Sequence, residues 1–253
     1  MLLGKKVLTV ILTLEEVALN AWPALYTVAY DGWIVRMTNG YTRRANAVHP
    51  LYASTLSLAE KINACESLYL SHGLPAIFKL TKASLPAELD ATLAARGYQR
   101  EDGAHVMTRA LTSLAPTHPA ARIETAVSDA WLGHYTRLNA ERARHHDILM
   151  RLFSAIAVPA AYMTLTCAAQ VVGVGIAVAE RGYVGLFGLA VDADFRRQGL
   201  GTQLVETCLY WGAAQGAREA YLQVHPANVP GIALYEHMGF RTAYRYWYRQ
   251  QPT

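Results

Sequence analysis

The stretch VGLFGLAVDADFRRQGLGTQLVETCLYWGAAQG, residues 184–216, decides the fold class of this chain. An apolar run reaches Val191, aspartates interrupt it, and two arginines and two glycines come next. A helical pattern follows, with apolar residues at Leu204, Val205, Cys208, Leu209 and Trp211. We predict a strand that runs through a glycine-rich turn into a helix, which is typical of α/β proteins.

A junction of this kind can bind an anion. The first backbone N–H groups of a helix have no partner within the helix, and the helix dipole adds positive potential there. Gly199 and Gly201 permit positive φ and a close approach of the backbone, while Arg196 and Arg197 add charge. An ordinary turn with solvated arginines is the alternative. The pattern is neither a P-loop nor a dinucleotide fingerprint, because the Gly-Lys-Ser/Thr ending and a third glycine are missing.

The rest of the second half predicts a mixed sheet with helices packed on it. Turn signals and periodicity give the following order: a strand over 121–127, helix from Ser128 to about 156, three antiparallel strands over 160–191 with turns near 168–170 and 181–182, the helix after Gly199, a strand over 218–224, a helix between Pro230 and Gly239, and a last strand over 241–250.

The first half repeats part of this pattern at an offset of 142 residues. Gly239-Phe240 falls 142 residues after Gly97-Tyr98, and Leu222 falls 142 after Leu80. Each half is expected to end with a strand, a turn, a short helix closed by Gly-aromatic, and a hairpin. The loop itself maps onto PLYASTLSLA, residues 50–59, which has neither the glycines nor the arginines. We predict two domains, 1–112 and 122–253, joined by a Pro-containing linker over 113–121, and ligand binding by the second alone.

The N-terminus has two possible interpretations. KKVLTVIL, residues 5–12, followed by the capping-box pattern Thr13 to Glu16 favours a strand and then a helix. A short signal peptide is the alternative, which the immediate Glu15-Glu16 pair disfavours. No apolar run in the sequence reaches the roughly 20 residues that span a membrane.

Composition narrows the classes of function. The chain has 253 residues, 17% of them charged, and a net charge of +4 without a dense Lys/Arg run, which argues against nucleic acid as a partner. Cys65, Cys167 and Cys208 lie far apart without a CxxC pair. This argues against a disulfide framework and a zinc site, and favours the cytoplasm. We expect no bound metal and no membrane association.

The motif Arg196-x-x-Gly199-x-Gly201, followed by NVPGIALYEHMGF at residues 228–240, resembles the GCN5-related N-acetyltransferase (GNAT) superfamily. The resemblance covers about residues 122–249. It implies the acyl-CoA N-acyltransferase fold, an α/β (α+β) mixed sheet, in two tandem copies, with the first half as a degenerate copy.

The resemblance also implies roles for individual residues. Acetyl-CoA would be the co-substrate, with its pyrophosphate on the segment Arg196, Arg197, Gln198, Gly199, Leu200, Gly201 and Thr202. The strand Leu189, Ala190 and Val191 would pair with the pantetheine arm, and one of its N–H groups would polarise the thioester carbonyl. Asn228 would contact the cofactor, cap a helix, or both. Tyr235 matches the tyrosine that serves the family as general acid, although a packing role is the alternative.

The acceptor side is less defined. Candidates for the general base are His225 and Glu180, and a water chain is an equal alternative. Strand alternation suggests Gln223 on the acceptor side. In the first half, Trp33, Arg43, Arg44 and Asn46 fall in a probable hairpin that could hold a carboxylate or phosphate of the acceptor. An exposed hairpin with solvated arginines is the alternative.

These observations predict an N-acetyltransferase that moves the acetyl group of acetyl-CoA to an amine through a tetrahedral intermediate. The acceptor is expected to be a small molecule or a peptide, and the chain a monomer or homodimer. The alternative is a CoA-binding regulatory or interaction module without transfer activity.

Overall fold

The computed structural model describes residues 2–112 and 121–252. Contacts divide the chain into two compact units. Unit 1 comprises residues 1–16, 22–105 and 244–253, and unit 2 comprises residues 17–21 and 106–243. Each unit is described by itself below.

The strands are hydrogen-bonded to their neighbours in the order β1-β2-β3-β4-β11-β5-β10-β9-β8-β7-β6, with both parallel and antiparallel pairs. Their bounds are β1 Tyr26–Tyr30, β2 Trp33–Met37, β3 Val48–Pro50, β4 Ile77–Leu80, β5 Gln99–Ala110, β6 Ala121–Glu124, β7 Ala160–Cys167, β8 Gln170–Glu180, β9 Tyr183–Val191, β10 Glu219–Val224 and β11 Arg241–Gln250. The helices are α1 Leu2–Ala21, α2 Leu58–Ser71, α3 Leu89–Ala95, α4 Asp129–Leu138, α5 His146–Ser154, α6 Leu200–Ala214 and α7 Val229–His237.

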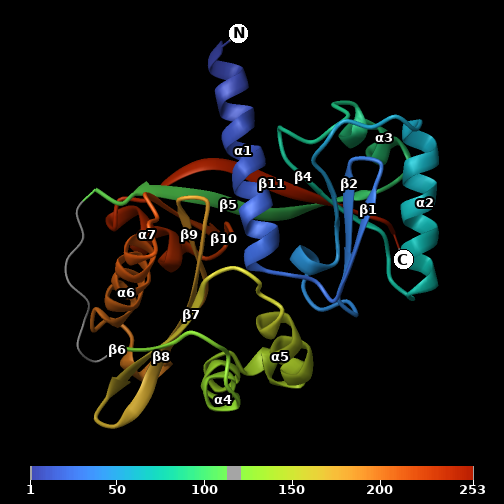
Figure 1. Ribbon diagram of the computed structural model, residues 1–253. Coiled ribbons are helices and arrows are strands. Elements are labelled where there is room, and N and C mark those ends of the chain that lie inside the picture. Colours follow the sequence, from blue (N-terminus) through green and yellow to red (C-terminus); the bar gives the residue numbers. More distant parts are fainter. Residues whose placement is uncertain (1, 113–120, 253) are drawn as a thin grey trace. The chain divides into compact units, whose positions relative to one another are not determined.

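Unit 2 has helices on both faces of its strands (Figure 1). Successive residues of β7 show the two faces, since side chains alternate along a strand. Tyr162 packs against Trp131 of α4 and Phe153 of α5, whereas Met163 contacts Cys208 of α6. The predicted order of elements in this half is confirmed, except that the helix predicted after Ser128 is divided into α4, a 3-10 helix over Ala140–His145, and α5. The turns at Ala168-Ala169 and Arg181-Gly182 are where expected, and all four residues have positive φ.

Unit 1 has the same two-sided arrangement. On β4, Phe78 and Leu80 face a core that Ile62, Cys65 and Tyr69 of α2 complete. Lys79, between them in sequence, instead contacts Glu15 of α1. A regular alternation on one short strand therefore assigns α1 and α2 to opposite faces.

The N-terminal prediction was wrong. Residues 2–21 form one helix, α1, and the strand over 5–12 and the capping box at Thr13 are absent from it. Ile11, Leu14, Val17, Ala18 and Ala21 are all buried, and their spacing of three or four residues forms one helical stripe. The Val and Thr residues in this part of the chain favour a strand. Packing of the buried stripe outweighs that preference, so the helix includes them.

One further prediction needs correction. The hairpins expected after Gly97 and Gly239 are single strands, β5 and β11.

The domain bounds stay a prediction. The predicted linker over 113–121 lies outside the described residues except for Ala121, which begins β6. Contacts group residues 244–253 with unit 1.

Two structural features recur at the offset of 142 residues. α2 begins at Leu58 and α6 at Leu200, and 200 − 58 = 142. The N–H of Tyr98 donates to the carbonyl of Leu93, and the N–H of Phe240 donates to the carbonyl of Tyr235, again 142 residues later. Gly97 and Gly239 occupy the left-handed region before each aromatic residue, with φ of 85° and 87°.

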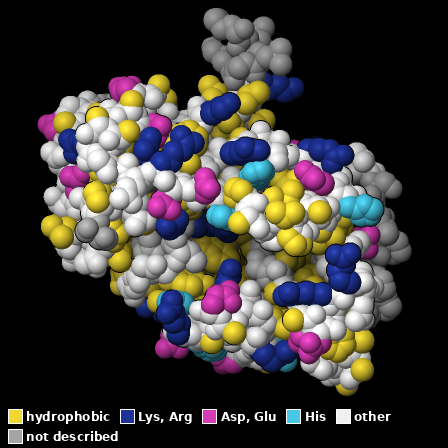
Figure 2. All heavy atoms as spheres, turned by 180° about the vertical axis from the view of Figure 1, so that it is seen from behind, with side chains coloured by type: hydrophobic (Ala, Val, Ile, Leu, Met, Phe, Trp, Pro, Cys, Tyr) yellow, Lys and Arg dark blue, Asp and Glu magenta, His cyan; other side chains and the backbone are white. Residues whose placement is uncertain are grey.

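No helix among the described residues is long and apolar enough to cross a membrane. On the face shown in Figure 2, basic and acidic side chains are interspersed, without a continuous basic tract.

A buried ion pair holds α1 to β4 within unit 1. The ammonium of Lys79 lies 2.5 Å from the carboxylate of Glu15, and the hydroxyl of Tyr244 donates to the same carboxylate at 2.7 Å. Burial by itself would raise the pKa of Glu15, but the charge of Lys79 and the proximity of His49 outweigh it and lower the pKa to about 2.

Replacing Glu15 should therefore change both stability and its dependence on pH. The Glu15→Gln variant leaves the Lys79 ammonium buried without a counter-ion, which costs about 3–5 kcal/mol of unfolding free energy at neutral pH. Because the pKa of Glu15 is depressed in the folded state, its contribution is present above its usual value of 4.5 and lost as pH falls toward 2. Urea unfolding across this range measures both effects. Glu88→Gln, at an exposed carboxylate of the same unit, is the control, and equal behaviour of the two variants would contradict the assignment.

Candidate ligand-binding site

A cavity of about 1140 Å³ opens in unit 2 where β9 runs into α6. It is lined by four segments: the end of β9 from Leu189 to Val191, the loop and first turns of α6 from Phe195 to Val205, the α7 region from Asn228 to His237, and residues 138–141 after α4. Eleven of the twelve residues predicted to bind the cofactor line it: Leu189, Ala190, Val191, Arg196, Arg197, Gly199, Leu200, Gly201, Thr202, Asn228 and Tyr235. Gln198 does not line it.

The loop before α6 has an unusual backbone. Arg197 and Gly199 both have positive φ, 62° and 78°, with Arg196 extended before them. Alternation of this kind can turn successive N–H groups toward one side and form an anion-binding concavity. Gly199 is the N-cap of α6, and the space beside its Cα is empty, since an added Cβ would meet nothing within 4 Å. The carbonyl of Gly199 accepts the first helical hydrogen bond, from Gln203, so the N–H groups between them have no helical partner.

Gly201 is required for a different reason from the one predicted. Its φ is not positive, because it lies within the first turn of α6. A Cβ at this position would lie 3.2 Å from Cδ2 of Leu234 on α7. Gly201 therefore permits the close approach of α7 to the start of α6, which narrows the cavity.

A β-bulge shapes the β9 wall of the cavity. Val174 and Ile176 of β8 face Ala190 and Phe187 of β9, so Gly188 and Leu189 lie together opposite Gly175. Gly188 has φ of 58°, and a Cβ there would lie 2.7 Å from the ring of Tyr135 on α4. The Tyr135 hydroxyl in turn accepts a hydrogen bond from Arg142.

β9 and β10 are paired over only part of their lengths. Their parallel register runs from Tyr183–Glu219 to Leu186–Leu222, whereas β9 continues to Val191 and β10 to Val224. The end of β9 that lines the cavity thus lies beyond this paired segment. An extended ligand can add alongside such a strand end.

Asn228 and Tyr235 reach the cavity from α7. The Asn228 side chain accepts a hydrogen bond from the N–H of Gly231 at 3.1 Å, so it caps the helix and lines the cavity at once. Tyr235 is half-buried, with its ring against Phe240. Burial and, to a lesser extent, Cys208 raise the pKa of Tyr235 to about 12, so its hydroxyl keeps its proton at neutral pH.

The predicted bases lie elsewhere. Glu180 accepts two hydrogen bonds from Asn20 and pairs with Tyr183, at the opposite end of β9 from Leu189. His225 is exposed, and its Nδ1 accepts a hydrogen bond from the N–H of Ala227 within a turn. Neither residue lines the cavity, nor does Gln223, which is half-buried on β10.

The four predicted acceptor residues belong to unit 1. Trp33 is fully buried in its core, and buried Asn46 bonds the backbone of its own loop through four hydrogen bonds. Both are therefore structural in this unit. Arg43 is exposed, with Glu101 at 3.5 Å, and Arg44 is half-buried with its guanidinium over Trp22.

Sequence reasoning missed the wall that residues 138–141 form. Leu138, Asn139 and Glu141 line the cavity from the end of α4, about 50 residues before the loop. Arg137 fixes this segment, since its guanidinium donates to Asp192 at 2.9 Å and to the carbonyl of Val171 at 2.5 Å. No sequence pattern predicts a contact between segments that are this far apart in the chain. Among the described residues, no group of three or more His, Cys, Asp or Glu could hold a metal.

Comparison with known proteins agrees with this arrangement. Residues 9–249 match the family described as "Probable histone acetyltransferase Rv0428c C-terminal". The chain is 27% identical over 241 residues to "Uncharacterized N-acetyltransferase YobR" of Bacillus subtilis, covering 93% of this chain and 96% of that protein.

Two solved structures share the fold. A GCN5-related N-acetyltransferase from Kribbella flavida has a TM-score of 0.68 at 12% identity, covering 91% of this chain and 90% of that one. A tandem GNAT protein from the clavulanic acid biosynthesis pathway has a TM-score of 0.62 at 14% identity, covering 94% and 88%.

The left-handed conformation of Gly199 can be tested with a matched pair of substitutions. Gly199→Ala should lower the unfolding free energy by roughly 1–2 kcal/mol, because a side chain disfavours positive φ. Gly133→Ala, in α4, should instead raise it by roughly 0.5–1 kcal/mol, because a helical glycine costs backbone entropy. A Cβ meets nothing within 4 Å at either position, so φ alone distinguishes them. Urea unfolding of both variants measures the difference, and the same sign for both would refute the explanation.

Proposed function

The chain belongs to the GNAT family of N-acetyltransferases, and we propose that it transfers the acetyl group of acetyl-CoA to an amine in the cavity at the start of α6. The observation that carries this proposal is the coincidence of three features in one cavity. They are the left-handed backbone at Arg197 and Gly199, the end of β9 that lies beyond its pairing with β10, and the protonated hydroxyl of Tyr235.

The donor matches these features along its length. The N–H groups of the first turn of α6, with Arg196 and Arg197 beside them, suit a pyrophosphate. The end of β9 beyond Leu186 suits the amide-containing pantetheine arm, which can hydrogen-bond like a strand. A backbone N–H near the bulge at Gly188 and Leu189 would hold the oxyanion.

The chemistry then needs the acceptor nitrogen to lose two protons and the sulfur to gain one. An ammonium acceptor first loses a proton to water, and the neutral amine nitrogen forms a bond to the acetyl carbon to give the tetrahedral intermediate. As the carbon–sulfur bond breaks, Tyr235 donates its proton to the departing sulfur, and the second proton that the nitrogen releases as it becomes an amide restores the tyrosine hydroxyl. Glu180 and His225 do not line the cavity, so a water chain to solvent is the base that we propose.

We also propose that the two halves are tandem copies, of which only the second binds the donor. The 142-residue offset of both helix starts and both closing hydrogen bonds supports the repeat. In the first half the position of Gly199 is Ser57, whose backbone N–H bonds the carboxylate of Glu60. Leu93 stands at the position of Tyr235, so the hydroxyl is missing as well.

The helix start in the first half already has an internal anion. Asp31 accepts hydrogen bonds from the N–H groups of Thr55 and Leu56 and from the Thr55 hydroxyl, and Lys61 lies 3.4 Å away. These backbone bonds hold the pKa of Asp31 well below its usual range. A carboxylate of the chain thus occupies the backbone donors that a phosphate would need, which supports one donor site per chain.

Donor binding is tested by thermal unfolding and calorimetry with acetyl-CoA. At a hundred times Kd the ligand should raise the unfolding free energy by about 2.7 kcal/mol, with one molecule bound per chain. Gly201→Glu should abolish both signals, because it places a carboxylate at the start of α6 and against Leu234. Gly133→Glu adds the same charge to the exposed side of α4 and should bind normally. Absence of binding to the native chain would overturn the proposal.

The role of Tyr235 is tested with a panel of amines, namely an N-terminal peptide, a lysine peptide and an aminoglycoside, by measuring thiol release. On any amine that reacts, Tyr235→Phe should lower kcat by about a hundredfold and leave acetyl-CoA binding unchanged. Tyr210→Phe, at an exposed tyrosine of α6 outside the cavity, is the matched control.

The pH profile gives a second test of Tyr235. Because its pKa is about 12, the native enzyme should show no loss of rate from this group between pH 7 and 10.

Donor binding without thiol release for every amine tested would favour the alternative, a silent CoA-binding module.

A further inference from the structure

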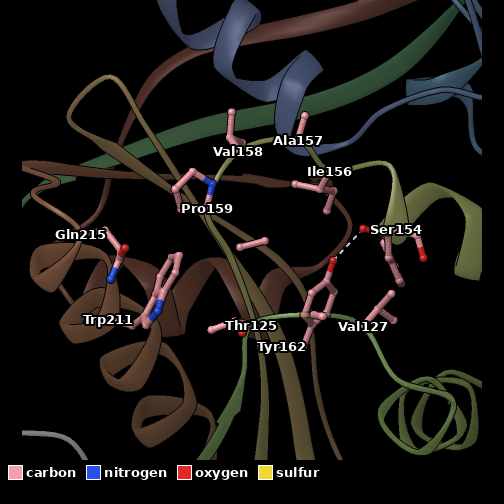
Figure 3. Close-up of a pocket in the computed structure, with 13 residues that line it drawn as sticks. Thr125, Val127, Ser154, Ile156, Ala157, Val158, Pro159, Tyr162, Trp211 and Gln215 are labelled. Atoms are coloured by element: carbon pink, nitrogen blue, oxygen red, sulfur yellow. Dashed lines mark hydrogen bonds between the residues drawn. The ribbon is translucent and has the colours of Figure 1, made fainter.

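A second cavity, of about 570 Å³, lies in unit 2 at the other end of α6. It is bounded by the connector after β6, the segment from Phe153 to Ala160 and the C-terminal end of α6 (Figure 3). No residue lines both cavities. α6 has 15 residues, so its two ends are roughly 20 Å apart.

The lining of this second cavity has no charged side chain. The donor cavity, by contrast, is lined by Arg196, Arg197 and Glu141. An ion entering the second cavity would lose hydration without gaining a counter-charge, which is costly. The chemistry of the lining therefore selects an uncharged ligand.

Aromatic and aliphatic side chains form its walls. Trp211 of α6 and Phe153 of α5 are 9% and 2% exposed, so each presents only an edge or a face. Figure 3 shows the Trp211 ring facing the segment that carries Ile156 and Pro159. The hydroxyl of Tyr162 donates to the carbonyl of Phe153 at 2.8 Å, so this polar group is engaged within the protein. A flat apolar ring suits such a surface.

Gln215 carries the carboxamide of the lining, whose other polar side chains include the hydroxyls of Thr125, Ser154 and Tyr162. Gln215, just after α6, is exposed and lies beside Trp211 in Figure 3. Its carboxamide carries both a donor and an acceptor, so it can pair with another amide through two hydrogen bonds. The loop on the opposite side is fixed, because the N–H of Ala179 donates to the carbonyl of Pro159 at 2.9 Å.

We propose that this cavity is a second ligand site, which takes an uncharged aromatic amide with its ring on Trp211 and its amide on Gln215. This site is independent of the proposed donor site, since it rests on different residues at the far end of α6.

The test uses benzamide, phenylacetamide and indole-3-acetamide as probes on the full chain, with saturation-transfer NMR as the readout. At least one probe should bind saturably. Phenylacetate, which differs from phenylacetamide by its charge, should bind at least tenfold more weakly. Failure of all three amides, or equal binding of the acid, would overturn the proposal.

Two substitutions locate the binding. Ala157 is exposed and lines the cavity, so Ala157→Phe should fill it and abolish probe binding, whereas Ala155→Phe, at an exposed position outside the lining, should not. Gln215→Glu should weaken amide binding at least tenfold, with Gln170→Glu on the distant β7–β8 turn as its control. Amide binding that persists in the Ala157→Phe variant would place the probe elsewhere and contradict the site. Acetyl-CoA binding, measured in parallel, should be unchanged in all four variants, so this test and that of the donor site fail separately.

Discussion

The start of α6 is the feature on which the rest of the site depends. A helix must leave its first N–H groups without internal partners, and most helices satisfy them with a side chain at the N-cap. Gly199 has no side chain to offer and a left-handed backbone, so the first N–H groups of α6 have no side-chain cap at a point where the loop lines the cavity. The N-terminus of α2, 142 residues earlier, is capped by side chains. There Ser57 and Glu60 form a capping box, and Asp31 takes the preceding N–H groups. The start of α6 thus has no side-chain cap, whereas the start of α2 is capped by Ser57.

The neighbouring strands are adapted to that opening. A regular β9 paired with β10 along its whole length would leave no backbone groups for a ligand. Instead the bulge at Gly188 and Leu189 diverts β9, and the paired segment ends at Leu186. The bulge needs a glycine because the ring of Tyr135 lies where a Cβ would be, so α4 sets the position of the strand end. Arg137 adds a second connection from α4, through Asp192 at the start of the loop. Helix packing on one face of the sheet therefore controls the wall of a cavity.

Local patterns in the sequence predicted most of unit 2, because they describe local physics. The turns at 168–169 and 181–182, the N-cap Ser128 and the C′ glycine Gly239 were all found where expected. The loop residues that line the cavity were found too, since a strand, a glycine-rich turn and a helix are contiguous in the chain. The features that the sequence did not reveal depend on long-range packing. Leu138 reaches the cavity although no pattern connects it to the loop, and Glu180, a predicted base, lies at the end of β9 opposite to Leu189. Residues 5–12 have strand-like composition, yet the buried stripe that follows makes them part of a helix.

The end of the chain shows why a boundary placed at a Pro-rich segment need not separate two folding units. The last ten residues are grouped with unit 1, although they follow every element of the donor cavity in sequence. Their contacts explain this grouping: the indole N–H of Trp247 and the guanidinium of Arg249 both donate to Asp90 at the start of α3, at 2.9 and 2.7 Å. Tyr244 completes the buried pair of Glu15 and Lys79. A fragment that begins after the linker would carry Tyr244, Trp247 and Arg249 without these partners. A fragment that ends before the linker would leave Glu15 without the Tyr244 hydroxyl and Asp90 without Trp247 and Arg249. The hydrogen bonds within unit 1 therefore include side chains of the last strand, which lies after the predicted linker in sequence.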